Sequence, residues 1–171
     1  MKKLENKVAI VTGAASGMGK AIALLFANEG AKVIVADLTA ADAEEVADQI
    51  RHTGGHALGL KCDVSDEEQV KRMVHGAIHE FGSLDILVNN AGIMDNFMPL
   101  ENVTDKLWEK VMAVNVNGPF YASRLAITRV TGSSASQAAK LVPSSTHACH
   151  GAIGWPSARR WSIRLAELTT M

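Results

Sequence analysis

The sequence is short of several residue types that mark particular classes of protein. It has two cysteines in 171 residues, Cys62 and Cys149, and they form no spaced pair for a metal site or a disulfide framework. Its formal net charge is -1, without the excess of Lys and Arg that phosphate backbones require. The composition therefore predicts no metal and no nucleic-acid partner, and it favours a reducing compartment, the cytoplasm.

Long apolar runs are also missing. Met1-Lys2-Lys3 resembles the start of a signal peptide, but the next apolar run, over residues 8–11, is interrupted at Thr12-Gly13. Neither a signal peptide nor a membrane span is therefore expected. With 171 residues, 47% of them hydrophobic, the chain has room for one globular domain with its own core.

Acidic residues nearly disappear in the last part of the chain. Residues 1–128 hold 17 acidic and 12 basic side chains, whereas residues 129–171 hold one acid, Glu167, and five bases. We therefore expect a domain over 1–128 and an atypical tail over 129–171, which either joins the same domain or packs poorly.

What the chain does contain is a glycine-rich turn at residues 12–19, with the sequence TGAASGMG. The apolar run over 8–11 precedes it and a helical pattern follows, which predicts a strand, a turn and a helix start. The backbone N–H groups of such a turn, and the positive end of the helix dipole, point to a place where a diphosphate can bind. Gly13 suits a tight turn, Gly17 a close approach of backbone to phosphate, and Gly19 a close packing of helix on strand.

A second strand, over residues 32–36, leads into Asp37. Dinucleotide-binding folds place a carboxylate at about this spacing, where it accepts hydrogen bonds from the adenosine ribose. The carboxylate would repel a 2′-phosphate, and no Arg or Lys follows closely, so Asp37 favours NAD over NADP. The alternative is a strand-end aspartate that caps the following helix.

Strand and helix patterns alternate along the rest of the domain. Ser65 opens a capping-box pattern for a helix that ends at Gly82, and Thr104 is the expected N-cap of the next helix. Further strands are expected over residues 56–62 and 84–88. The alternation predicts an α/β fold, a doubly wound, Rossmann-type parallel sheet of four strands in three layers, with its ligand site at the carboxyl ends of the strands.

Four motifs in this order resemble the short-chain dehydrogenase/reductase family over roughly residues 4–128. They are the glycine turn, Asp63-Val64, Asn89-Asn90-Ala91-Gly92 and Asn115-Val116-Asn117-Gly118. The resemblance implies a Rossmann fold that binds NAD(P) across the strand ends and transfers hydride between NAD(H) and an alcohol or ketone substrate. Dimers and tetramers are common in this family, partly through the helix after Asn115, so the resemblance also allows a homo-oligomer.

The resemblance assigns roles to particular residues. Asp63 and Val64 would hold the adenine. Residues 90–92 would line a ribose of the cofactor, and Asn115 would be the active-site asparagine. The residues expected to bind NAD are Gly13, Ser16, Gly17, Met18, Gly19, Asp37, Asp63, Val64, Asn90, Ala91 and Gly92.

The chain departs from the family in its catalytic residues. The family uses a serine and a Tyr-x3-Lys pair beyond the asparagine, in which the tyrosine exchanges a proton with the substrate oxygen. The single tyrosine, Tyr121, has no lysine four residues later. In the segment that resembles the Tyr-x3-Lys neighbourhood, Ser145 and Cys149 stand at the tyrosine and lysine positions, and neither has the required acidity or charge. The best match to the family's serine is Ser136.

Three explanations of this departure follow. A frameshift or deletion that rewrote the sequence after about residue 128 would give a truncated or altered relative of a longer dehydrogenase, with turnover at least ~1000-fold below that of an intact relative. Alternatively, the chain is a non-catalytic dinucleotide-binding module or partner subunit, or an unstable product with an unpaired strand. In each case we expect a sheet that is incomplete at its C-terminal edge.

Overall fold

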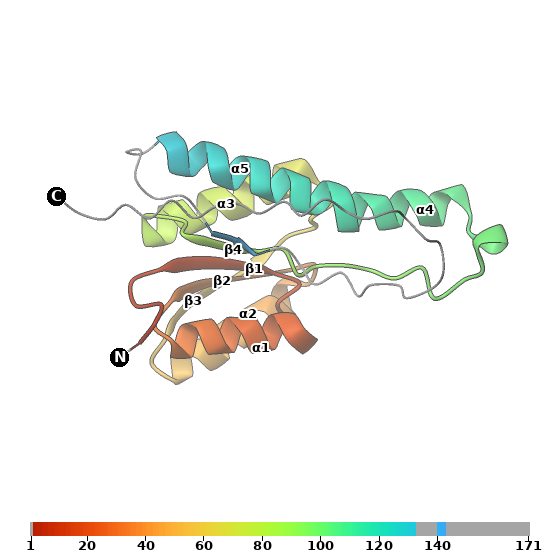
Figure 1. Cartoon of the computed structure of the whole chain (residues 1–171). Coiled ribbons are helices and arrows are strands. Elements are labelled where there is room, and N and C mark those ends of the chain that lie inside the picture. Colours follow the sequence, from red (N-terminus) through yellow and green to blue (C-terminus); the bar gives the residue numbers. More distant parts are fainter. Residues whose placement is uncertain (1, 133–139, 143–171) are drawn as a thin grey trace, which may run out of the picture.

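The structure, a computed structural model, describes residues 2–132 and 140–142. Its five strands form one sheet between two layers of helices (Figure 1). The strands are β1 (Val8–Thr12), β2 (Lys32–Asp37), β3 (His56–Lys61), β4 (Ile86–Val88) and β5 (Lys140–Val142). Their order in the sheet is β3-β2-β1-β4-β5, and all neighbouring pairs are parallel.

The predicted α/β fold with a parallel, doubly wound sheet is confirmed, but the expected number of strands is wrong by one. The sequence predicts no strand after β4, whereas β5 pairs with β4 in parallel through Lys140, Leu141 and Val142. Three residues are too few to show the alternation by which a strand is recognised in a sequence.

The helices are divided between the two faces of the sheet (Figure 1). One face carries α1 (Gly17–Asn28) and α2 (Ala40–His52), and the other carries α3 (Glu67–Phe81) and α5 (Gly118–Gly132). The remaining helix, α4 (Asp105–Met112), follows a 3-10 turn at Leu100–Asn102 and leads into α5 through a π-helical turn at Ala113–Asn117. Within the described residues, no helix combines the length and the apolar character needed to span a bilayer.

The core lies on both faces of β1 and β2, because alternate residues of these strands point to opposite helical layers. All five residues of β1 are buried. Ala9 and Val11 pack in a cluster with residues of α1 and α2, whereas Val8 and Ile10 pack with residues of α3 and α5. The strands therefore read as nearly continuous apolar runs.

The start of α3 lies one residue later than the capping-box pattern predicts. Asp66, and not Ser65, is the N-cap, and its carboxylate accepts hydrogen bonds from the backbone N–H groups of Glu68 (2.9 Å) and Gln69 (3.2 Å). The side-chain amide of Gln69 also donates to Asp66, and together these hydrogen bonds hold the pKa of Asp66 below its usual value. Ser65 instead donates its hydroxyl to Asp63.

The other predicted helix ends are where the sequence places them. Thr104 caps α4 by accepting a hydrogen bond of 3.2 Å from the backbone N–H of Leu107. Gly82 ends α3 with a left-handed backbone conformation (φ 84°). Both features depend on local sequence, which explains why they can be read without the tertiary structure.

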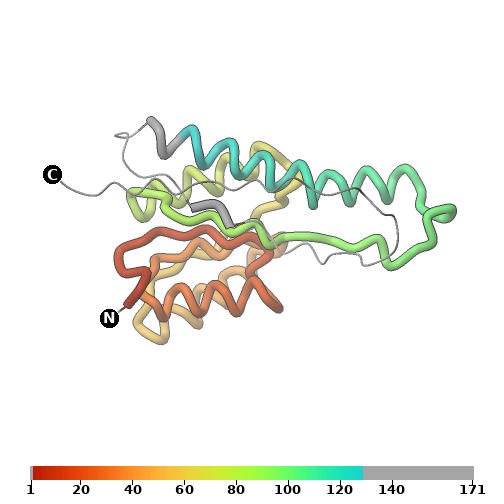
Figure 2. Tube along the Cα trace, viewed as in Figure 1, coloured from red at the N-terminus to blue at the C-terminus, as the bar shows by residue number. Residues whose placement is uncertain are grey.

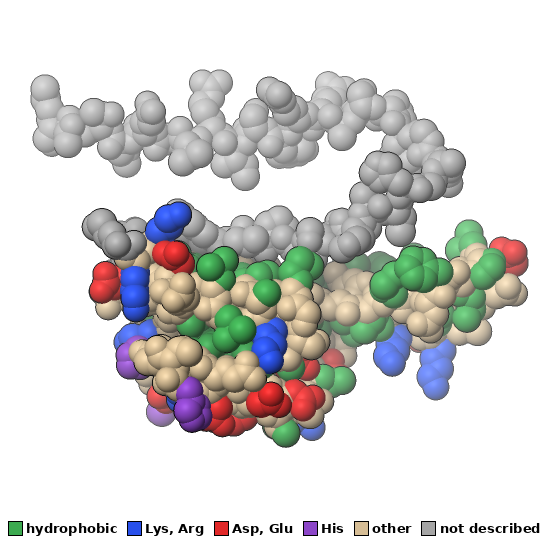
Figure 3. Space-filling model, turned by 90° about the horizontal axis from the view of Figure 1, so that it is seen from below, with side chains coloured by type: hydrophobic (Ala, Val, Ile, Leu, Met, Phe, Trp, Pro, Cys, Tyr) green, Lys and Arg blue, Asp and Glu red, His purple; other side chains and the backbone are tan. Residues whose placement is uncertain are grey.

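Residues 93–104, between β4 and α4, extend away from the sheet (Figure 2). Large apolar side chains on this projecting segment are exposed, with Phe97 83% and Leu100 82% accessible. Figure 3 shows apolar side chains gathered on the same projecting part of the molecule. The segment therefore presents apolar surface directly beyond the end of β4.

Candidate functional site

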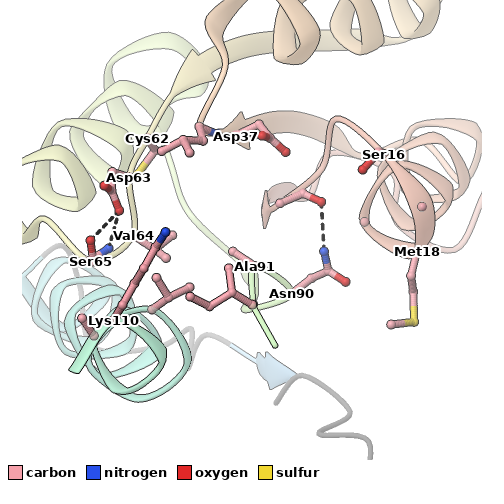
Figure 4. Close-up of a pocket in the computed structure, with 18 residues that line it drawn as sticks. Ser16, Met18, Asp37, Cys62, Asp63, Val64, Ser65, Asn90, Ala91 and Lys110 are labelled. Carbon is pink, nitrogen blue, oxygen red and sulfur yellow. Dashed lines mark hydrogen bonds between the residues drawn. The ribbon is translucent and has the colours of Figure 1, made fainter. Parts of the chain in front are cut away.

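A cavity of about 530 Å³ lies at the carboxyl ends of β1 to β4 (Figure 4). Its walls include all eleven residues that the sequence predicts to bind the cofactor, namely Gly13, Ser16, Gly17, Met18, Gly19, Asp37, Asp63, Val64, Asn90, Ala91 and Gly92. It also includes residues that the sequence analysis missed: Leu38, Cys62, Ser65, Ile93, Lys110, Ala113 and Val114. The fold thus brings three of the four motifs, together with Asp37, to one site, while their role in cofactor binding stays a prediction.

The glycine turn wraps closely around the end of β1 and the segment after β4. Gly13 has φ +61°, and a Cβ atom there would lie 2.9 Å from the Cα atom of Ala91. A Cβ atom on Gly19 would lie 2.2 Å from the carbonyl oxygen of Gly13, so α1 packs against the turn itself. No side chain larger than hydrogen fits at either position without displacing backbone.

The N-terminus of α1 faces the cavity with its backbone N–H groups uncapped by a side chain. Ser16 occupies the N-cap position and makes no side-chain cap hydrogen bond. A Cβ atom on Gly17, at φ +52°, would meet nothing within 4 Å, so the backbone there is open to the cavity. This uncapped, open helix start fits a diphosphate group.

Thr12 joins the end of β1 to the segment after β4. Its hydroxyl oxygen accepts hydrogen bonds from the backbone N–H groups of Asn90 (3.0 Å) and Ala91 (3.1 Å), and donates to the carbonyl of Val88 (3.3 Å). The side-chain amide of Asn90 donates to the carbonyl oxygens of Thr12 (2.9 Å) and Gly13 (3.0 Å). The side chain of Asn90 therefore fixes the glycine turn, in addition to lining the cavity.

Asp37 is held at the end of β2 by two backbone groups. One carboxylate oxygen accepts a hydrogen bond of 2.9 Å from the N–H of Ala15 in the glycine turn, and the other accepts one of 2.7 Å from the N–H of Leu38. The alternative role as a helix cap is wrong, because α2 has Thr39 as its N-cap. The carboxylate lies instead in the wall of the cavity, in contact with the turn.

The cavity wall after β3 is ordered around Asp63. One oxygen of its carboxylate accepts hydrogen bonds from the hydroxyl (2.6 Å) and the backbone N–H (2.9 Å) of Ser65. The backbone N–H of Asp63 donates to the side chain of Gln69.

Burial raises the pKa of the neighbouring Cys62 thiol to about 12, with a further contribution from the charge of Asp63, so this thiol is neutral at physiological pH.

Asn115 lies in the π-helical turn between α4 and α5 and fixes the segment after β4. Its side-chain amide donates to the carbonyl of Ile93 (2.8 Å) and accepts from the N–H of the same residue (2.9 Å). A Cβ atom on Gly92 would lie 3.4 Å from the Asn115 side-chain oxygen. Asn115 is exposed and is not among the residues that line the cavity, and its role as an active-site asparagine stays a prediction.

The described residues supply no replacement for the family's catalytic tyrosine. Tyr121 is half-buried on α5, packs with the cluster that includes α3, and lies against Phe120 at 5.9 Å between ring centroids. It does not line the cavity. Ser136, Ser145 and Cys149 lie outside the described residues.

The described part of the chain holds no group of three or more His, Cys, Asp or Glu side chains that could bind a metal ion.

Three of the lining residues that the motifs do not include, Lys110, Ala113 and Val114, come from α4 and the π-helical turn and have the spacing i, i+3, i+4. That spacing is a signal that the sequence contains, since it places three side chains on one helical face.

The sequence matches the short chain dehydrogenase family over residues 7–157. It is 40% identical over 124 residues to 3beta-hydroxysteroid dehydrogenase 2 of Eggerthella lenta, covering 72% of this chain and 48% of that protein. It is 38% identical over 162 residues to an uncharacterized oxidoreductase of Bacillus subtilis, covering 90% of this chain and 59% of that one. The chain therefore spans about half the length of the curated relatives that it matches.

The fold agrees with a solved structure of the same kind. A short chain dehydrogenase from Mycobacterium avium superposes with a TM-score of 0.74 at 36% sequence identity, covering 77% of this chain and 48% of that one. The family match also extends beyond residue 128, where the sequence analysis ended the resemblance. Members of this family are oxidoreductases that use NAD or NADP, and the relatives above are named as dehydrogenases or an oxidoreductase. From its motifs, its fold and these matches, the chain belongs to the short-chain dehydrogenase family.

Proposed function

We propose that the chain binds NAD in the cavity at the strand ends, and that the reaction associated with this site is hydride transfer between NAD(H) and an alcohol or ketone. The observation that carries the choice of NAD is the placement of Asp37. Its carboxylate lies in the cavity wall and is held by the N–H groups of Ala15 and Leu38. A fixed negative charge there accepts hydrogen bonds from ribose hydroxyls and repels a 2′-phosphate.

The rest of the cavity fits the other parts of a dinucleotide. The uncapped start of α1, from Ser16 to Gly19, suits the diphosphate. Asp63 and Val64 suit the adenine, and residues 90–92 suit a ribose, because small side chains there allow close approach to the backbone. When bound, NAD would supply the nicotinamide ring that accepts or donates hydride.

We further propose that this chain turns over slowly. Tyr121 lies away from the cavity, and the Asn115 side chain is engaged by the backbone of Ile93. Loss of a catalytic acid or base typically costs about 10²–10⁴ in rate. The second candidate function, a non-catalytic dinucleotide-binding module, is favoured by the same contrast: the eleven predicted cofactor residues line the cavity, whereas no tyrosine of the described residues does.

A homo-oligomer is a separate part of the proposal. Trp108 on α4, Val116 in the π-helical turn, and Phe120 and Ile127 on α5 are large apolar residues with 47–57% of their surface exposed. Exposed apolar side chains along one continuous pair of helices are typical of a surface that packs against a partner. We propose that a second copy of the chain covers it.

The choice of cofactor is tested by reversing the charge of Asp37. We expect Asp37→Arg to weaken NAD binding about 10- to 100-fold in calorimetric titrations, because charge-assisted hydrogen bonds to the ribose are lost. Asp42→Arg is the matched control, since Asp42 is exposed in the first turn of α2 and does not line the cavity.

Asp37→Asn serves as a second variant, because it keeps an acceptor for Ala15 and separates loss of charge from a distorted turn. Equal NAD affinity for the parent chain and Asp37→Arg would contradict the assignment of this site. NADH-dependent ketone reduction by the pure chain at the rate of an intact relative would contradict the proposed slow turnover.

A further inference from the structure

We propose that Lys110 is a specificity residue of the cavity, whose ammonium group binds a ring nitrogen of the adenine. The inference rests on the proposed binding of NAD. It concerns a residue that the sequence motifs do not include, because Lys110 lies on α4, outside the glycine turn and outside both asparagine motifs.

Lys110 lies on the face of α4 that forms a wall of the cavity. It lines the cavity together with Ala113 and Val114, which follow on the same helical face. Figure 4 shows the Lys110 side chain reaching from α4 toward the loop that carries Val64 and Ser65. The ammonium group is therefore on the side of the cavity that is formed by the loop after β3.

Within residues 2–132 and 140–142, no ion pair uses the charge of Lys110. The ion pairs of the described residues involve Lys7, Lys71, Arg51 and Arg124, and none involves Lys110. Lys110 is also the one Lys or Arg among the described residues that line the cavity. A cation that the described residues leave without an ion-pair partner, placed in the wall of a cavity, is available to a ligand.

Asp63 provides the opposite charge in the same part of the cavity. Ser65 donates both its hydroxyl and its backbone N–H to one oxygen of the Asp63 carboxylate, which fixes the group. The second carboxylate oxygen accepts no hydrogen bond from the described side chains or backbone. The cavity therefore offers a ligand one fixed acceptor from Asp63 and one flexible donor from Lys110.

Adenine has the hydrogen-bonding groups that match this pair. Its exocyclic amino group donates, and the ring nitrogens N1 and N7 on either side of it accept. A purine with a carbonyl oxygen in place of the amino group would present an acceptor to the Asp63 carboxylate, which is unfavourable. Asp63 and Lys110 together therefore favour an adenine nucleotide.

The experiment compares Lys110→Met with Lys106→Met in calorimetric titrations with NAD. Methionine keeps most of the aliphatic chain and removes the charge, and Lys106 is an exposed lysine one turn earlier on α4 that does not line the cavity. We expect Lys110→Met to weaken NAD binding about 5- to 10-fold and Lys106→Met to change it less than twofold. Equal affinities for the two variants would overturn the inference.

NAD analogues with carbon in place of adenine N1 or N7 identify the atom that Lys110 contacts. For one of the two analogues we expect Lys110→Met and the parent chain to bind equally, because the acceptor is already absent. If Lys110→Met weakens both analogues as much as it weakens NAD, the lysine does not contact the ring nitrogens and the inference is overturned.

Failure of this inference is distinguishable from failure of the proposed function. A parent chain that binds NAD, and that loses affinity with Asp37→Arg but not with Lys110→Met, overturns the role of Lys110 alone. A parent chain that binds no NAD overturns both. A stronger effect of Lys110→Met on NADP than on NAD would assign the lysine to the 2′-phosphate and would also overturn the contact with adenine.

Discussion

The hydroxyl oxygen of Thr12, at the end of β1, accepts a hydrogen bond of 3.0 Å from the backbone N–H of Asn90, 78 residues later in the sequence. The side chain of Asn90 returns a hydrogen bond of 2.9 Å to the carbonyl of Thr12. Thr12 is 1% exposed, so these hydrogen bonds are shielded from water. The glycine turn and the segment after β4 are therefore joined into one unit beneath the cavity.

Thr12→Val tests this connection. Valine has nearly the shape of threonine but cannot accept the N–H groups of Asn90 and Ala91, so we expect a loss of about 1–3 kcal/mol in the free energy of unfolding. Urea denaturation followed by circular dichroism measures it. Thr12→Ser keeps the hydroxyl and is the control. A valine variant as stable as the serine variant would show that the hydrogen bonds to Asn90 and Ala91 do not stabilise the fold.

The close packing of Gly13 against Ala91 and the positive φ of Gly13 can be tested separately. Gly13 and Gly82 both have positive φ, but a Cβ atom on Gly13 would lie 2.9 Å from the Ala91 backbone, whereas one on Gly82 would meet nothing within 4 Å. We expect Gly82→Ala to cost about 1–2 kcal/mol through backbone strain alone, and Gly13→Ala to cost more. Thermal unfolding of the two variants measures the difference, and equal costs would contradict the close packing.

The buried thiol of Cys62 should be unreactive in the folded chain. Its pKa is raised to about 12 by burial, so the reactive thiolate is scarce below pH 10. In a Cys149→Ser background, we expect slow alkylation by iodoacetamide at pH 8 and rapid alkylation after unfolding in urea. Equal rates in the two conditions would show that Cys62 is accessible.

The raised pKa of Cys62 also predicts how the stability of the fold depends on pH. The unfolded thiol ionises near pH 9, its ordinary value, while the folded thiol remains protonated until about pH 12. The unfolded chain then binds fewer protons than the folded chain, so the contribution of Cys62 to stability is complete below pH 9 and decreases as the pH rises toward 12. We expect Cys62→Ala to reduce the fall in the urea midpoint between pH 8 and pH 10.

The proposed homo-oligomer is tested on α5. Ile127 is 47% exposed on the apolar surface formed by Trp108, Val116, Phe120 and Ile127. We expect the parent chain to form dimers or larger species in light scattering after size exclusion, and Ile127→Glu to shift it toward the monomer. Leu25→Glu, which places the same charge on an exposed apolar position of α1, is the control and should leave the mass unchanged.

Much of the candidate site could be predicted because its residues lie in short motifs with fixed spacing. The glycine turn follows β1, Asp37 is the last residue of β2, and Asp63 follows β3, and the sequence shows each of these strands plainly. In a parallel sheet the carboxyl ends of the strands meet at one edge, so residues that follow the strands converge there. The eleven predicted residues line one cavity for this reason.

The choice between two adjacent residues that could both begin a helix was harder to predict. Ser65 and Asp66 both suit the start of α3, and the choice of Asp66 depends on Ser65 being engaged by Asp63 in the cavity wall. Likewise, strand β5 has three residues, and among the described strands it pairs with β4 alone, so its strand conformation comes from the neighbouring strand and not from its own pattern.

The sequence by itself determined the α/β alternation, the turn at residues 12–19 and the family, because apolar periodicity and motif spacing are local properties of the chain. Only the tertiary structure decided which partners these residues contact. Asp37 binds the N–H of Ala15, Asn115 binds the backbone of Ile93, and Lys110 enters the cavity wall from α4. Such contacts join residues far apart in sequence, and they exist only once the strands and helices have packed.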